Sequence, residues 1–300
     1  MSEGATYLGF MDESHHTASN QFTACGLTVI DAKHAKTLHE KIKIIRANHG
    51  FSNEVSLKWT PPTGWKTPEE RQPHTQAKKE VLDLLATGGV HFFGYLHFNP
   101  KKELNDSTRN SQFGFNTLLG GFDKWLGTNG SVGHVTFDRM EWSGAFEYLK
   151  EKNCSGLVFS SQERTSELSN ILSYSMGAAR TSELCCLNDV ITGALAYVAN
   201  ISHAIDTRAK IVKSMSRGLL RGEDFRFAET SFFMRPKEKS KLSAERRAEY
   251  DTIRAFLNNA LVWRRQGICD AIPSIKAHHC KADGPKRKVR GTTHLTGKIK

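Results

Sequence analysis

The sequence predicts an α/β fold with one mixed five-stranded sheet and flanking helices, and three observations support this prediction. Short aromatic and β-branched runs alternate with longer segments whose apolar residues recur at helical spacing. The alternation is clearest between residues 132 and 200. The chain also has 300 residues, of which 38% are apolar and 24% charged. It is therefore long enough to bury a sizeable core against a helix-covered sheet, and disorder of the whole chain is excluded.

The first third of the chain contains two strand-like runs followed by two segments with helical periodicity. In order, these are residues 6–11, 21–30, 32–48 and 69–86. The two strands are close enough in sequence to form a hairpin. A proline-punctuated loop separates the two helical patterns. We therefore expect a hairpin and then a helical insertion over about residues 32–88.

The middle of the chain alternates strands and helices. The expected strands are residues 90–98, 132–137 and 156–160, and the expected helices are residues 112–126, 144–152 and 183–200. Together with the hairpin, this order places three antiparallel strands before two parallel ones, which fits an RNase H-like arrangement. We expect this core to occupy residues 1–203.

The C-terminal third is basic. Residues 204–300 carry 23 Lys and Arg against 10 Asp and Glu, a net charge of +13, while the remaining residues sum to −2. We expect a basic helical extension over 204–280, with helices near 208–221 and 242–265, and a disordered basic tail over 281–300. Such asymmetry is typical of an appendage that contacts a polyanion. The alternative is a solvated basic surface.

The sequence also predicts where in the cell the protein is located. The N-terminus shows no leader pattern, and no apolar run approaches the roughly 18 residues that suggest a membrane span. The six cysteines show no repeated spacing, which favours reduced thiols. We expect a soluble cytoplasmic protein without a membrane partner.

Three aspartates follow or lie on elements that should meet. Asp12 follows the first strand's apolar run, Asp138 ends a later strand, and Asp189 lies on the last core helix. Carboxylates from two neighbouring strand ends and a covering helix can bind Mg²⁺ or Mn²⁺, which prefer oxygen ligands. Otherwise Asp12 makes a turn, Asp138 caps a helix and Asp189 is a solvated charge.

Several motifs of the chain resemble one microbial family. They are the Asp-Glu-Ser run at residues 7–14, the pair Lys58-Trp59, the strand-ending Asp138, and the helical segment 186–194 with its aspartate, glycine and alanine. Over roughly residues 5–203 they are similar to the family catalogued as domain of unknown function 3800. The resemblance implies an RNase H-like core with an aspartate metal site. It also implies a protein partner in a phage-defence or mobile-element system.

The sequence offers two candidates for a fourth catalytic carboxylate. RNase H proteins supply a metal-site glutamate from the helix that corresponds to residues 112–126, and here that segment contains none. Glu13 is our candidate, with Glu54 as the alternative. Because side chains alternate along a strand, Glu13 can equally face away from Asp12.

Lys58 and Trp59 are candidate nucleic-acid contacts. Lys58 would contact a scissile phosphate, and Trp59 would stack on a base. For Trp59, which follows apolar Val55 and Leu57, the alternative of a buried anchor is favoured.

Other polar groups are weaker candidates. His15 and His16 are placed for proton transfer or for a polar turn, and the turn is favoured. Cys269, His278, His279 and Cys280 include zinc-ligand types but lack paired short spacings, which disfavours zinc. In the tail, the expected phosphate contacts are Lys286, Arg287, Lys288 and Arg290. Their binding should be independent of nucleotide sequence.

The predicted function is hydrolysis of DNA or RNA phosphodiester bonds by a Mg²⁺- or Mn²⁺-dependent nuclease. Metal-bound water would be the nucleophile. Two alternatives stay open: transposase- or integrase-like strand transfer, and a non-catalytic nucleic-acid-binding or phage-defence subunit that keeps the fold. The sequence predicts no oligomeric state.

Overall fold

Six strands form one mixed sheet in the order β7-β4-β1-β2-β3-β8. β2 is antiparallel to both of its neighbours, whereas the pairs β1–β4, β4–β7 and β3–β8 are parallel. The strands are β1 (Thr6–His15), β2 (Phe22–Asp31), β3 (Val90–Phe98), β4 (Val132–Phe137), β7 (Ile171–Met176) and β8 (Phe232–Arg235). The α/β class, the mixed sheet and the flanking helices are therefore confirmed.

The computed structural model describes most of the first 256 residues. The described residues are 4–15, 22–52, 54–99, 107–140, 142–159, 164–177, 182–219, 231–237, 240 and 242–256. They belong to one compact unit, residues 1–261. No helix among them is long and apolar enough to cross a membrane.

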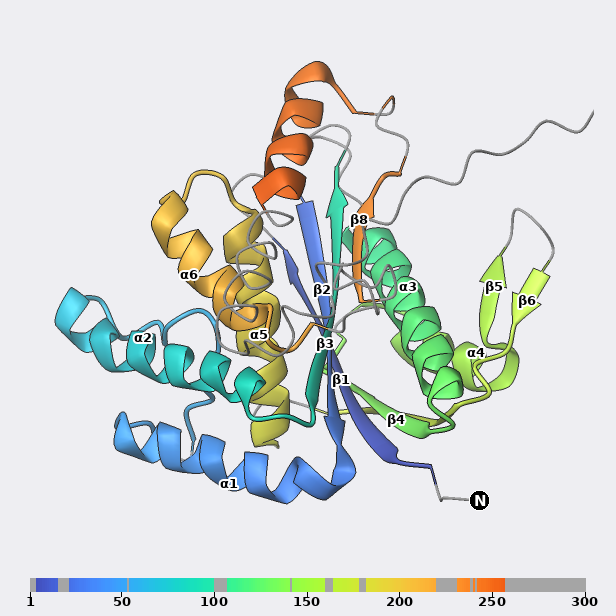
Figure 1. Ribbon diagram of the computed structural model, residues 1–300, viewed down its shortest axis with the longest axis horizontal. Helices are drawn as coiled ribbons and strands as arrows, with labels where there is room; N and C mark the ends of the chain where they lie inside the picture. Colours follow the sequence, from blue (N-terminus) through green and yellow to red (C-terminus); the bar gives the residue numbers. More distant parts are fainter. Residues whose placement is uncertain are drawn as a thin grey trace, which may run out of the picture. The chain divides into compact units, whose positions relative to one another are not determined.

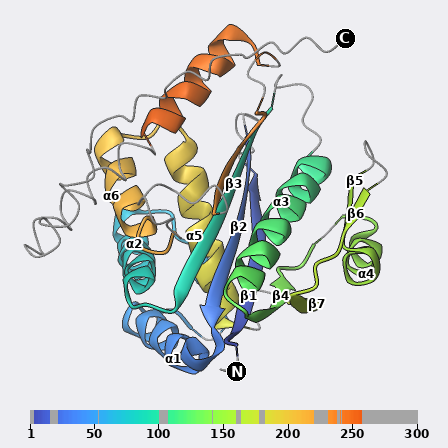
Figure 2. The same ribbon diagram turned by 45° about the vertical axis from the view of Figure 1, so that its right-hand side comes forward.

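Helices cover both faces of the sheet (Figures 1 and 2). One face carries α1 (Ala32–Asn48), α2 (Pro68–Asp83), α5 (Glu183–Ala199) and α6 (Ile205–Met215), and the other carries α3 (Ser107–Thr128) and α4 (Ala145–Ser155). A 3-10 turn, Leu84–Ala86, follows α2. These helices lie close to the ranges expected from apolar periodicity.

Side chains along β1 point alternately to the two faces of the sheet and enter two separate cores. Phe10 packs into the core beneath α5, while its neighbour Met11 packs into the core beneath α3. Because successive side chains of a strand point to opposite faces, Asp12 lies on the α5 side and Glu13 on the α3 side. The apolar pattern of the strand therefore sets which acidic side chain faces α5.

The prediction that residues 156–160 form the fifth strand of the main sheet was wrong. Residues 156–160 do form a strand, β5 (Leu157–Phe159), but it pairs with β6 (Arg164–Ser166) in a separate two-stranded sheet. The position beside β4 belongs to β7, which is long enough to pair along nearly all of β4. β7 has a weak apolar pattern because Ser173 and Ser175 lie on its exposed face.

The expected number of five strands was also wrong, because the basic C-terminal region contributes β8. This strand pairs in parallel with β3 and forms the far edge of the sheet. The helices expected in that region are α6 and a helix over residues 244–256. Four residues are too few to show strand periodicity, and pairing with β3 stabilises β8. The tail predicted over 281–300 lies outside the described residues.

Candidate metal centre

Three aspartates meet at one end of the sheet. One carboxylate oxygen from each of Asp12, Asp138 and Asp189 lies within 4.8 Å of the others, and the three side chains are partly buried. Asp12 lies on β1, Asp138 directly follows its parallel neighbour β4, and Asp189 lies on α5. The carboxyl ends of parallel strands lie at the same edge of a sheet, so this convergence follows from the strand order.

Main-chain hydrogen bonds fix the two strand aspartates. The N–H of Asp138 donates to the carbonyl of Met11 at 2.8 Å, which extends the β1–β4 pairing by one residue. Asp12 Oδ1 accepts from the N–H of Glu13, and Asp138 Oδ1 accepts from that of Arg139. Each carboxylate thus uses one oxygen locally. Asp138 does not cap α4, because the N-cap residue of this helix is Gly144 and there is no side-chain cap.

Close packing of α5 on β2 brings Asp189 to the site. Asn188 Oδ1 accepts from the main-chain N–H and the hydroxyl of Thr28 at 3.1 and 2.8 Å. One turn further, a Cβ on Gly26 would lie 2.1 Å from Thr192 Oγ1, so only glycine allows this approach. The buried Asn188 therefore fixes the rotation of α5 that turns Asp189 toward Asp12.

The segment Lys58-Trp59 contacts Asp189 directly. The Trp59 N–H donates to Asp189 Oδ1 at 2.7 Å, and Lys58 Nζ lies 3.6 Å from Oδ2. Lys58 is half-exposed, whereas the Trp59 ring lies edge-on to Tyr197 and packs over Gly193. The structure therefore places the Lys58 ammonium at the carboxylates and gives Trp59 the packing of an anchor.

The surroundings of the site raise the proton affinity of Asp12 and Asp189. Burial raises the pKa of Asp12 well above its usual value, and the charges of Asp189, Glu13 and Asp138 raise it further. Burial also raises the pKa of Asp189, although the Trp59 N–H and Lys58 oppose the rise. Burial lowers the pKa of Lys58, but the three aspartates raise it more. Clustered acidic groups of this kind favour a bound cation.

Glu13 lies beside the three aspartates but outside their group. Burial raises the pKa of its carboxyl to about 7, and the charge of Asp138 contributes to the rise. The side chain points to the α3 side of β1, as strand alternation allows. Glu54, the alternative, is exposed on the loop after α1, and the group of three ligand side chains does not include it.

Of the other predicted residues, His15 lies in the described part of the chain. The main chain of His15 pairs with Thr23 at the end of β1. The remaining candidates lie outside the described residues: His16, Cys269, His278, His279, Cys280, Lys286, Arg287, Lys288 and Arg290. The roles predicted for them stay predictions.

The sequence did not indicate the residues that hold the Lys58-Trp59 segment. His74 Nε2 donates to the Lys58 carbonyl at 2.8 Å, and Lys78 Nζ donates to the Trp59 carbonyl at 2.9 Å. Both come from α2, four residues apart on one face. This spacing is the only sequence signal, and helix faces with polar residues are usually solvated. Burial lowers the pKa of His74 to about 4, so its ring is neutral at pH 7.

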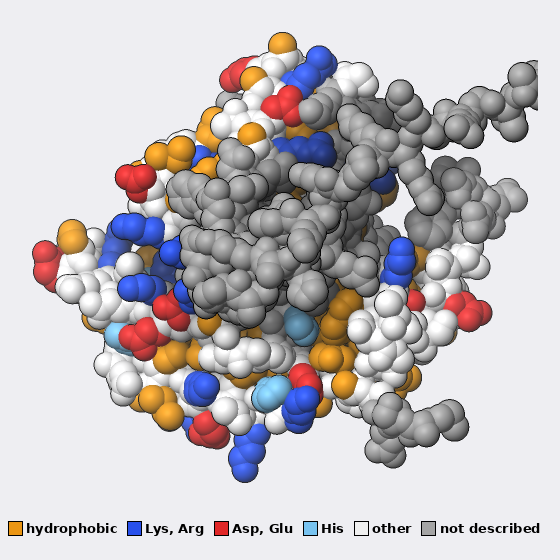
Figure 3. All heavy atoms as spheres, in the orientation of Figure 1, with side chains coloured by type: hydrophobic (Ala, Val, Ile, Leu, Met, Phe, Trp, Pro, Cys, Tyr) orange, Lys and Arg blue, Asp and Glu red, His pale blue; other side chains and the backbone are white. Residues whose placement is uncertain are grey.

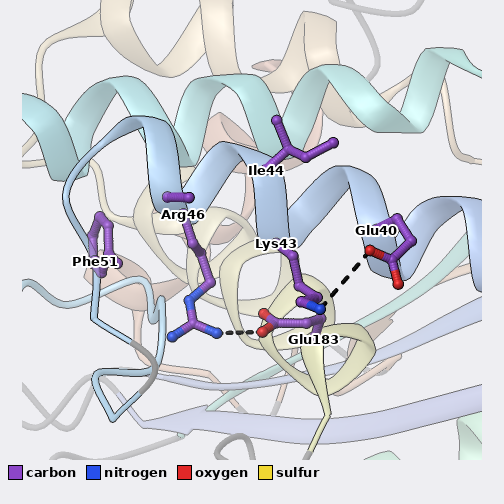
Figure 4. Close-up of a pocket in the computed structure, with 7 residues that line it drawn as sticks. Glu40, Lys43, Ile44, Arg46, Phe51 and Glu183 are labelled. Atoms are coloured by element: carbon purple, nitrogen blue, oxygen red, sulfur yellow. Dashed lines mark hydrogen bonds and ion pairs between the residues drawn. The ribbon is translucent and has the colours of Figure 1, made fainter.

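A buried ion pair anchors the chain just before that segment. Arg46 on α1 pairs with Glu183 at the start of α5 (Figure 4), and it also donates to the carbonyls of Ser52 and Val55 at 2.8 and 2.7 Å. Arg46 therefore joins α1, α5 and the loop that leads to Lys58.

A hollow of about 240 Å³ lies beside this ion pair. Its lining residues are Glu40, Lys43, Ile44, Arg46, Ala47, Phe51 and Glu183 (Figure 4). None of the three aspartates lines it. The hollow therefore lies apart from the candidate metal centre.

Charges of both signs lie on the described surface. On the face drawn in Figure 3, Lys and Arg side chains are interspersed with Asp and Glu side chains around the edge. The described part of this face therefore has no purely basic character.

Comparison with known proteins adds no family. Neither a scan against protein-family models nor a search of curated proteins found a match for this chain. The resemblance to the family catalogued as domain of unknown function 3800 therefore stays a prediction.

Proposed function

We propose that the protein is a Mg²⁺- or Mn²⁺-dependent nuclease that hydrolyses phosphodiester bonds of DNA or RNA. The observation that carries this proposal is the convergence of Asp12, Asp138 and Asp189, which come from two parallel strands and a covering helix. Three carboxylates on three fixed elements, each with one oxygen close to the others, match the oxygen preference of these ions.

The strand order supports an RNase H-like core. In β3-β2-β1-β4-β7, three antiparallel strands are followed by two strands parallel to β1. β8 extends this arrangement at the β3 edge. Asp12 and Asp138 lie toward the carboxyl ends of the neighbouring strands β1 and β4, where open α/β sheets commonly bind ligands.

The protein's own groups have distinct parts in the proposed reaction. Asp12, Asp138 and Asp189 hold the metal ion, and the Lys58 ammonium beside them contacts a phosphate oxygen of the substrate. A bound ion would activate water and stabilise the leaving oxygen. Glu13, on the other side of β1 near Asp138, is the proposed fourth acidic residue, and burial raises the pKa of its carboxyl to about 7.

The proposal is tested by incubating wild-type protein and Asp138→Asn with single-stranded DNA, duplex DNA, RNA and RNA–DNA hybrid. Each substrate is tested in Mg²⁺, Mn²⁺ or EDTA. We expect wild-type cleavage that EDTA abolishes and that Asp138→Asn reduces about 1000-fold or more, because a metal ligand is lost. Asp206→Asn, at an exposed position on α6, is the matched control and should cleave normally.

Other products would redirect the interpretation. Joined DNA strands in place of hydrolysed ones would indicate strand transfer. Nucleic-acid binding by folded wild type without turnover in either metal would overturn the nuclease and favour a non-catalytic subunit of a defence or mobile-element complex.

Lys58→Met provides a separate prediction about substrate binding. We expect kcat/KM to fall about 10–100-fold, mainly through KM, because a charge-assisted phosphate contact is lost. The thermal midpoint should change little, since the ion pair with Asp189 is half-exposed and worth little to stability. Steady-state kinetics measure the effect, with Lys66→Met on the same loop as control. Unchanged kinetics would remove Lys58 from substrate binding.

A further inference from the structure

The two oxygens of Asp189 have different surroundings. Oδ1 accepts a 2.7 Å hydrogen bond from the Trp59 main-chain N–H, whereas Oδ2 lies 3.6 Å from Lys58 Nζ. The Trp59 N–H is part of a fixed main chain, but the Lys58 side chain is half-exposed and can turn away. Oδ1 is therefore committed to the protein, and Oδ2 is the oxygen that a small movement of Lys58 releases.

The Trp59 main chain is held in place by its own side chain. The ring packs over Gly193, where a Cβ would lie 2.1 Å from Trp59 Cβ, and it lies 5.5 Å from the Tyr197 ring. On its other side, Lys78 Nζ lies 4.1 Å from the ring centroid and donates to the Trp59 carbonyl. Ring and carbonyl are thus fixed between α5 and α2, and the N–H is fixed with them.

We propose that Trp59 is a positioning residue that restricts Asp189 to one metal-ligating oxygen and thereby favours Mg²⁺ over larger cations. Mg²⁺ requires near-ideal octahedral geometry with short bonds, whereas Ca²⁺ accepts two oxygens of one carboxylate in a flexible shell. A carboxylate with one oxygen held by a main-chain N–H offers a single oxygen to the metal, and a ligand of this kind suits Mg²⁺. This inference rests on the proposed metal centre and adds its ion selectivity.

The experiment measures the dissociation constants of Mg²⁺ and Ca²⁺ by calorimetry on full-length wild type, Trp59→Ala, Trp59→Phe and Trp65→Ala. Without the ring, the Trp59 N–H loses the packing against α5 that holds it on Oδ1, and Asp189 can offer both oxygens. We expect Trp59→Ala to weaken Mg²⁺ binding about 10–100-fold, as loss of a group that orients a metal ligand does. Ca²⁺ binding should weaken less or tighten. Trp59→Phe should restore most of the Mg²⁺ affinity.

Trp65→Ala is the matched control. Trp65 is on the same loop and is partly buried against Phe51 and His74, so its loss removes a similar ring without freeing Asp189. Its thermal midpoint should fall, while the ratio of the two dissociation constants should stay at the wild-type value. Equal changes of that ratio in Trp59→Ala and Trp65→Ala would show a merely structural role and overturn the inference.

The outcomes separate this inference from the nuclease proposal. If wild type binds Mg²⁺ and the ratio changes as expected but no substrate is cleaved, ion selectivity stands and the nuclease fails. If wild type cleaves and Trp59→Ala keeps the wild-type ratio, only the inference fails. If wild type binds neither ion, both are overturned.

Discussion

Asp12→Asn should abolish cleavage and at the same time stabilise the metal-free protein. Cleavage should fall about 1000-fold or more because a metal ligand is lost. In EDTA at pH 7 the thermal midpoint should rise by about 2–4 °C, equivalent to roughly 1 kcal/mol. The physical reason is that burial and the charges of neighbouring carboxylates disfavour the ionised form of Asp12 in the folded state.

The stability of the metal-free protein should depend on pH, and the direction follows from the shifted pKa values. The pKa values of Asp12, Glu13 and Asp189 are raised in the folded protein, so the folded state binds more protons than the unfolded state at intermediate pH. The stabilisation is complete below the unfolded pKa values, near 4. It is lost as pH rises through the folded values, of which that of Glu13 is about 7. The contribution of these three carboxyl groups to metal-free stability should therefore fall as the pH rises from about 4 to about 7.

Thermal denaturation in EDTA across this pH range, monitored by circular dichroism, measures both effects. Asp12→Asn should show a shallower fall than wild type, and excess Mg²⁺ should raise the midpoint of wild type more than that of the variant. Asp206→Asn should follow the wild-type curve. A lower midpoint for Asp12→Asn at pH 7 in EDTA would contradict the electrostatic account of the site.

Arg46→Met should have the largest effect on stability. It leaves the nearly buried Glu183 without its ionic partner and the carbonyls of Ser52 and Val55 without a donor. Breaking a buried ion pair by removing one partner costs about 3–5 kcal/mol. The side chain of Met fills much of the same space, so the loss reports on charge and hydrogen bonding rather than on a cavity.

Urea unfolding of Arg46→Met, Glu183→Gln and the double variant measures this coupling. The double variant should recover part of the loss, because no buried charge is then left unpaired. Lys43→Met, at a half-exposed position on α1, is the control and should be close to wild type. Strictly additive losses in the double variant would show that the two charges do not stabilise each other.

The same ion pair connects stability to the site. Arg46 holds the chain at Ser52 and Val55, directly before Lys58-Trp59. We therefore expect the folded fraction of Arg46→Met to bind Mg²⁺ more weakly as well, because the segment that holds Asp189 is less fixed.

Local sequence patterns were sufficient for the helices and for the three aspartates. Apolar spacing predicted α1, α2, α3, α4 and α5 near their observed ranges. Asp12 and Asp138 were predicted to meet because each ends an apolar run, and ends of adjacent parallel strands lie together. A periodic pattern encodes which side of an element is buried, and this information is present within ten to twenty residues.

Strand partners required the tertiary structure. Residues 157–159 and 171–176 both follow β4, and the shorter segment has the more apolar composition, yet only the second pairs with β4. β8 gains its conformation from β3, which lies more than 130 residues earlier. Such pairing depends on which edge of the sheet is free, and the sequence of a short segment contains little information about that edge.

The sequence by itself determined the α/β class, the helix positions and the three acidic residues of the candidate site. Only the tertiary structure decided how those acids are held: Asn188 turns α5 through Thr28, and Trp59 holds one oxygen of Asp189. These contacts join residues that are 160 and 130 positions apart. The physical reason is that hydrogen bonds between distant segments depend on how closely whole elements pack, which no local periodicity encodes.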